Sequence, residues 1–219
     1  MQLDSVVIGA SDVAETIGAY ALLLGIDTTM PAAGGGQRLQ LARGAVEIVP
    51  GELGLLAVGF LADEGFTPPP SFHGIDVRLR TTPAPPAPAA APDGAEAIGH
   101  VVVQSTDPER AIALWQGRLG LRLALDRTFP ERGVRLLFFR TGGITLEYAS
   151  PLDAPTAAED RLYGVSYRVC DLAVRRARLV AAGLDVSEIR PGARPGTRVA
   201  TVRSGTAGVA TLLLEVLGG

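Results

Sequence analysis

The sequence predicts an α+β protein built from tandem units, each with a strand, a helix and then three further strands. Two observations lead to this prediction. The β-branched runs at residues 3–8 and 98–103 are each followed, four residues later, by an aspartate suited to cap a helix. A constant offset of 95 residues then keeps the apolar positions of the two following segments in step. The chain therefore contains an internal structural repeat.

The predicted helices have both of their ends marked in the sequence. Asp12 and Asp107 stand at the N-cap positions, and Gly25 and Gly120 stand where a left-handed residue commonly closes a helix. A third copy of the unit follows, with a strand at 164–169, a helix starting after Asp171 and later strands at 198–203 and 211–216. The C-terminal part therefore holds two complete units.

The N-terminal part holds one complete unit and one degraded unit. Residues 55–61 suit a first strand, but the prolines at 68–70 stand where the helix would be, and only 75–79 is a clear later strand. Residues 83–96 are rich in proline and alanine and lack apolar periodicity, which predicts a linker. We therefore expect a degraded half at 1–82 and a complete domain at 97–219.

Composition excludes several classes of function. The 219 residues are 47% hydrophobic and 20% charged, with a net charge of −3 and no basic cluster, which argues against nucleic acid as a partner. One cysteine and two histidines exclude zinc-finger sites and favour a reducing compartment. No basic leader or apolar run of about 18 residues is present, so we expect a cytoplasmic protein that does not insert into a membrane.

Four segments in the C-terminal part resemble the vicinal oxygen chelate superfamily, which includes glyoxalases, bleomycin-resistance proteins and extradiol dioxygenases. They are GHVVVQSTDPERAIALWQGRLGL, ITLEYASP, YGVSYRVCDL and TLLLEV. LDSVVIGASDVAETIGAYALLLGID and AVEIVP extend the resemblance into the N-terminal part. The resemblance implies paired βαβββ modules whose mixed sheets form two cups with helices on the outer face. It also implies a divalent metal held by the first and last strands of each module.

The superfamily's ligand positions can be transferred individually to the C-terminal modules. The resemblance places His100 on the first strand of the first module, Glu147 on its last strand, and Glu215 on the last strand of the second module. The remaining first-strand position is Gly164, which has no side chain to coordinate a metal. The implied ligand set is therefore incomplete.

In the N-terminal half, the same transfer gives Glu47 at a last-strand position. Ser5 stands where a histidine would be, and Ala57 is the nearest residue to the other first-strand position. We therefore expect no metal in this half.

Strand alternation bears on where these side chains point. Alternation sets Glu147 opposite Leu146 and Tyr148, which suggests that Glu147 faces the cup together with His100. The same reasoning directs Glu215 into the cup, so that Glu147 and Glu215 are the expected catalytic carboxylates. In the alternative interpretation, both glutamates lie on a solvated sheet face and His100 only forms a hydrogen bond.

Three further residues are candidates for contacting a substrate. Tyr167 and Phe138 are expected cavity walls. Arg198 lies in the Gly/Pro-rich stretch 190–198, whose three arginines are able to clamp a carboxylate or a phosphate. The alternative is a solvated hairpin without a ligand.

Two functions remain open. The first is a lyase or isomerase in which a divalent metal of unknown identity polarises a small substrate while a glutamate moves a proton. The second is a metal-free protein that binds or sequesters a small molecule in the cup. Either function implies a small-molecule partner, and a homodimer is a possible assembly.

Overall fold

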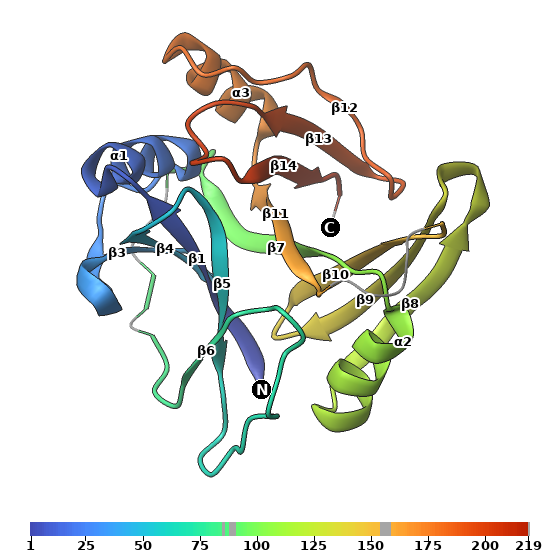
Figure 1. The fold of residues 1–219 in the computed structure, drawn as a ribbon. Helices are drawn as coiled ribbons and strands as arrows, with labels where there is room; N and C mark the ends of the chain where they lie inside the picture. Colours follow the sequence, from blue (N-terminus) through green and yellow to red (C-terminus); the bar gives the residue numbers. More distant parts are fainter. Residues whose placement is uncertain (85, 88–90, 154–158, 219) are drawn as a thin grey trace.

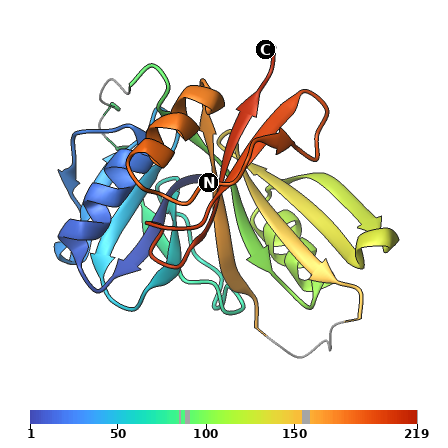
Figure 2. The same ribbon diagram turned by 90° about the horizontal axis from the view of Figure 1, so that it is seen from above.

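The computed structural model describes residues 1–84, 86–87, 91–153 and 159–218. It has two mixed β-sheets, of six and eight strands, with helices packed on their outer faces (Figures 1 and 2). This confirms the predicted α+β class. Part of the predicted linker, residues 85 and 88–90, lies outside the described residues.

The N-terminal sheet has the order β2-β3-β4-β1-β5-β6. The first and last strands of the complete unit, β1 and β4, run parallel. In the degraded unit β5 pairs in parallel with β6, and residues 62–76 between them contain no helix. The elements of this half are β1 (Gln2–Ala10), α1 (Val13–Leu24), β2 (Met30–Pro31), η1 (Ala33–Gly35), β3 (Gln37–Gln40), β4 (Ala45–Pro50), β5 (Gly54–Leu61) and β6 (Val77–Arg80).

The C-terminal sheet has the order β12-β13-β14-β11-β7-β10-β9-β8. Its two units repeat the parallel pairing, β7 with β10 and β11 with β14, and they join through the antiparallel pair β7 and β11. The elements of this half are β7 (Ala95–Gln104), α2 (Pro108–Ala111), η2 (Ile112–Arg118), β8 (Arg122–Phe129), η3 (Pro130–Arg132), β9 (Val134–Thr141), β10 (Ile144–Pro151), β11 (Arg161–Val169), α3 (Leu172–Ala181), β12 (Arg190–Pro191), β13 (Thr197–Val202) and β14 (Ala210–Val216).

The three helices begin at the predicted caps. The carboxylates of Asp12, Asp107 and Asp171 each accept a hydrogen bond from the backbone N–H three residues later. Gly25 closes α1 with φ +70°, a left-handed conformation that glycine adopts without steric cost. Local sequence chemistry therefore sets the start of each helix.

The second helix changes its hydrogen-bond pattern after one turn. From Ile112 to Arg118 it is a π-helix, and this segment buries Trp115 completely. The Trp115 indole Nε1 donates to the Tyr148 hydroxyl at 2.6 Å. The Trp115 ring also stacks on Phe60 of the N-terminal sheet, with ring centroids 5.6 Å apart. A helix of the C-terminal half therefore covers a strand of the N-terminal half.

The reverse contact is made by α1. Tyr20 on α1 is fully buried, and its hydroxyl donates to the backbone carbonyl of Thr206. One continuous cluster of buried apolar side chains accordingly spans both halves.

A buried arginine joins the two halves where α1 and α3 lie side by side (Figure 2). The guanidinium of Arg175 on α3 donates to the Leu22 carbonyl at 2.8 Å, and it lies 2.8 Å from the carboxylate of Asp93. Burial lowers the pKa of Arg175, while the charge of Asp93 opposes that shift. Asp93 lies two residues before β7, so this contact fixes the connection between the halves to both helices.

Among the described residues, no helix combines the length and apolar character needed to cross a lipid bilayer.

Candidate functional site

A cavity of about 400 Å³ lies against the C-terminal sheet and is bordered by both of its modules. Phe138 from β9 and Leu212 and Leu214 from β14 provide apolar walls. His100 from β7 and Glu147 from β10 provide polar groups. The cavity therefore combines an apolar lining with a small polar centre, as small-molecule sites commonly do.

His100 and Glu147 form a pair at this centre. His100 Nδ1 lies 3.0 Å from Glu147 Oε2. Strand alternation explains their placement, because Val101 on β7 and Leu146 and Tyr148 on β10 are fully buried on the opposite face. When Glu147 is ionised it can only accept, so Nδ1–H of His100 donates this hydrogen bond, and in the neutral imidazole Nε2 is then the acceptor atom.

Two neighbours orient His100. Its backbone N–H donates to the Ser166 hydroxyl on β11 at 2.8 Å. The Phe138 ring lies against the imidazole, with centroids 5.5 Å apart. Phe138 and Ser166 both border the cavity, and contact of Phe138 with a substrate stays a prediction. The sequence did not reveal the role of Ser166, because a lone serine within a strand does not by itself indicate a site.

Glu215 does not share this cavity, which corrects the expectation drawn from strand alternation. On β14 the residues lining the cavity are Leu212, Leu214 and Val216, so Glu215 points from the other face of the strand. There its carboxylate accepts a hydrogen bond from Arg198 Nε at 2.7 Å, in a pair set by the β13–β14 register. The segment Leu212 to Leu214 is uniformly apolar, so its sequence does not reveal which face is buried.

The strand register identifies the residue that corresponds to Glu147. Thr145 pairs with His100 in the first module, and Ala210 pairs with Gly164 in the second. Two residues further along, Glu147 therefore corresponds to Leu212. The second module thus presents a glycine and a leucine at the two positions where the first presents a histidine and a glutamate.

Packing explains the glycine on β11. A Cβ atom at Gly164 would lie 2.5 Å from the backbone carbonyl oxygen of Ala210 on the paired strand. Because this contact is with backbone, a larger residue at this position, histidine included, would force the two paired strands to shift.

Two of the expected substrate contacts are also corrected. Tyr167 is fully buried among core residues, where burial raises the pKa of its hydroxyl well above the usual value, and its neighbour Ser166 faces the cavity instead. Arg198 is bound to Glu215 on the opposite side of the sheet from the cavity. Arg194, from the same Gly/Pro-rich stretch, does border the cavity.

Four arginines border the cavity, contributed by separate segments of the chain. Arg140 donates to the Thr145 hydroxyl at 2.6 Å, and Arg168 Nε lies 3.3 Å from a carboxylate oxygen of Glu96. Arg132 and Arg194 complete the set. Glu147 is the one carboxylate among the described lining residues, so the cavity has an excess of positive charge.

Comparison with known families agrees with this architecture. The sequence model of the Glyoxalase/Bleomycin resistance protein/Dioxygenase superfamily matches residues 99–201. The match covers just under half of the chain, and residues 99–201 resemble a domain of this superfamily. No curated protein sequence matches the chain. The resemblance of the C-terminal half to the vicinal oxygen chelate superfamily is thereby confirmed.

Solved structures show a similar fold at low sequence identity. Methylmalonyl-CoA epimerase from Mycobacterium tuberculosis is 20% identical, with a TM-score of 0.49 over 60% of this chain and 93% of that chain. A hypothetical protein from Bacillus halodurans C-125 is 23% identical, with a TM-score of 0.47 over 56% and 95% of the respective chains. A Streptomyces coelicolor methylmalonyl-CoA epimerase variant, in complex with 2-nitronate-propionyl-CoA, is 19% identical, with a TM-score of 0.45 over 55% and 97%.

Members of the superfamily commonly use a divalent metal, but the residues of this domain do not fit one. His100 and Glu147 stand at two of the positions where the resemblance implies ligands, whereas Gly164 and Leu212 stand at the corresponding positions of the second module and offer no side-chain donor atom. Within the described parts of the chain, no group of three or more His, Cys, Asp or Glu side chains lies close enough to hold a metal ion.

Proposed function

We propose that the C-terminal cup binds a small organic molecule without a metal ion. The observation that carries this proposal is the pair Gly164 and Leu212 at the positions that correspond to His100 and Glu147. Two donors, already bonded to each other, are a poor site for a divalent cation, because such ions take at least four ligands from protein and water.

The chemistry of the lining supports an anionic ligand with an apolar body. Phe138, Leu212 and Leu214 offer an apolar surface, and Arg132 and Arg168 border the same cavity. Arginine binds carboxylates and phosphates through paired N–H donors. A small aromatic carboxylate has both features and serves as a suitable probe.

The His100–Glu147 pair favours a second candidate, a lyase or isomerase. In this second candidate Nε2 of His100 is the group that accepts a proton from the ligand, while Glu147 holds the proton on Nδ1. A cytoplasmic location and a homodimer stay predictions in either case.

Metal-dependent melting curves test the absence of a metal site. A ligand that binds the native state raises the melting temperature. Since we propose that no metal binds, the native protein is expected to show the same melting temperature with and without Mn²⁺, Ni²⁺, Zn²⁺ or Mg²⁺. The variant Leu212→Glu is expected to gain a shift with at least one of these ions, since it adds a carboxylate to the cavity that holds His100 and Glu147.

Leu212→Glu serves as the positive control for the assay. A metal-dependent shift in the native protein that Glu147→Gln removes would contradict the metal-free proposal and favour the enzyme.

Calorimetric titration with benzoate tests the ligand class, with benzyl alcohol as the uncharged comparison. Benzoate is expected to bind more tightly than benzyl alcohol. Arg168→Gln is expected to weaken benzoate about tenfold or more, because a charge-assisted hydrogen bond contributes roughly 1.5–3 kcal/mol. Phe138→Ala is expected to weaken both ligands.

The exposed arginine of the Arg203–Asp185 ion pair supplies the control. Arg203→Gln is expected to leave both affinities unchanged. Equal affinities for benzoate and benzyl alcohol would show that the arginines do not recognise the ligand.

A further inference from the structure

A second cavity, of about 370 Å³, lies against the N-terminal sheet. Ser5 on β1 and Glu47 on β4 border it. Ser5 corresponds to His100 through the 95-residue offset of the repeat. Glu47 corresponds to Glu147, because it pairs with Val7 as Glu147 pairs with Val102. The N-terminal half therefore retains a cup, with different chemistry at its centre.

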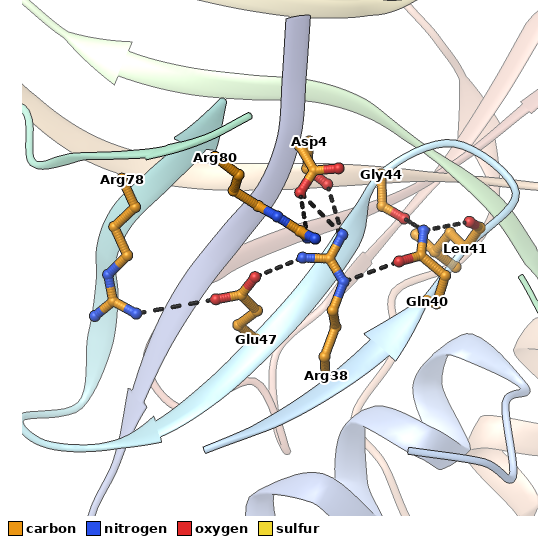
Figure 3. A network of polar contacts seen from close by, with 8 residues as sticks. All are labelled: Asp4, Arg38, Gln40, Leu41, Gly44, Glu47, Arg78 and Arg80. Atoms are coloured by element: carbon orange, nitrogen blue, oxygen red, sulfur yellow. Dashed lines mark hydrogen bonds and ion pairs between the residues drawn. The ribbon is translucent and has the colours of Figure 1, made fainter. Parts of the chain in front are cut away.

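The positively charged guanidinium of Arg38 lies between the carboxylates of Asp4 and Glu47 (Figure 3). This guanidinium is nearly buried, with 5% of the side chain exposed. It donates to Glu47 Oε1 at 2.5 Å, to Asp4 Oδ2 at 3.0 Å and to Gln40 Oε1 at 2.9 Å. The nitrogen atoms of Arg38 are thus all engaged, and both carboxylates are paired with a positive charge.

Two more arginines reach the same centre from β6. Arg78 and Arg80 are two residues apart on this strand, so their side chains leave the same face, and both border the cavity. Arg80 donates to Asp4 Oδ2 at 3.1 Å. Arg78 lies 3.9 Å from Glu47 Oε2, beyond hydrogen-bond distance. Three guanidiniums therefore face two carboxylates, which leaves one positive charge without a counterpart in this cluster.

Several donors in this cavity lack an acceptor. Within the described residues, the Arg78 guanidinium and the Ser5 hydroxyl make no hydrogen bond, and Arg80 uses one of its five N–H groups. Ser5 is 1% exposed, and Gly59 on the paired strand leaves the space that its hydroxyl occupies. Arg78 and Arg80 border the cavity and are partly exposed, so a ligand can reach their donors from solvent.

We propose that the N-terminal cavity binds the oxyanion group of a small molecule, a carboxylate or a phosphate, between Arg78 and Arg80, with the Ser5 hydroxyl as a further donor. Both anions accept paired N–H donors from arginine. Arg38 does not contact the ligand in this arrangement. It neutralises Asp4 and Glu47, which would otherwise repel an anion. The proposal concerns a different cavity from the metal-free site of the C-terminal half and does not depend on it.

Calorimetric titration at constant ionic strength tests the proposal, with inorganic phosphate and malonate as the two probes and chloride as the balancing salt. The native protein is expected to bind at least one probe, and the difference between them identifies the preferred oxyanion. Arg78→Gln is expected to weaken that probe about tenfold or more, the loss that removal of a charge-assisted hydrogen bond produces. This variant should fold, because Arg78 is 44% exposed and has no hydrogen bond to lose within the described residues.

Two control variants locate the binding. Arg203→Gln removes an exposed arginine that borders neither of the two cavities, and Arg132→Gln removes one from the C-terminal cavity. Arg203→Gln is not expected to change the affinity of the probe, and Arg132→Gln is not expected to change the binding that Arg78→Gln weakens. The proposal is overturned if the native protein binds neither probe, if Arg78→Gln binds as tightly as native, or if Arg132→Gln alone weakens binding.

Discussion

Replacing Arg175 with alanine is expected to lower the free energy of unfolding by about 3–5 kcal/mol, the cost of leaving one member of a buried ion pair without its partner. Arg175 and Asp93 are 3% and 5% exposed, so water cannot replace the lost contact. The variant also removes the donors to the carbonyls of Leu22 and Asp93. Urea unfolding followed by tryptophan fluorescence measures the change, since Trp115 is fully buried.

Arg178 supplies the matched control for this prediction. It lies on the same helix and 3.4 Å from the same carboxylate, but its side chain is 58% exposed. Arg178→Ala is expected to change stability by less than about 1 kcal/mol, because solvent screens exposed ion pairs. Similar losses in the two variants would show that burial of Arg175 does not determine its contribution.

Replacing Arg38 with methionine is expected to cost about 3 kcal/mol, since methionine fills the space but leaves Asp4 and Glu47 without the cation that binds both. The side chains of these two carboxylates are 13% and 11% exposed. Adding Glu47→Gln to Arg38→Met is expected to recover some of the loss, because one unpaired charge is then removed. Chemical denaturation of the single and double variants measures both effects.

A surface pair gives the comparison for Arg38. Arg135 binds Asp126 and Glu109, which are 38% and 72% exposed, and its hydrogen bonds to Asp126 lower the pKa of that carboxyl group. Arg135→Met is expected to cost at most about 1 kcal/mol. If Arg38→Met lowers the free energy of unfolding no more than Arg135→Met does, the stability of the N-terminal half does not depend on the charge of Arg38.

The repeat and the helices could be predicted because their determinants are local. Asp12, Asp107 and Asp171 each bind a backbone N–H three residues away, so a short stretch of sequence contains the whole interaction. The faces of His100 and Glu147 could be predicted in a similar way, because their neighbours along the strand are apolar and fully buried.

The remaining features of the two sites depend on pairing between distant strands. The orientation of Glu215 is set by the β13–β14 register, and Leu212 is matched to Glu147 through hydrogen bonds to two different strands. Tyr167 follows an irregularity in the β11–β7 pairing, so counting along the sequence does not give its face. The arginines of both cavities come from separate segments, and their convergence has no local signature.

The exchange of helix contacts between the halves has a consequence for how the chain folds during synthesis. Phe60 obtains its stacking partner from Trp115, and Tyr20 obtains its hydrogen-bond acceptor from Thr206. A ribosome releases the chain from its N-terminus, so helix α1 emerges long before the backbone carbonyl that its tyrosine will contact. The N-terminal half therefore reaches its final packing only after Thr206 has been synthesised. Such contacts between distant segments of the sequence are expected to make folding slow, because the chain closes large loops before these contacts form.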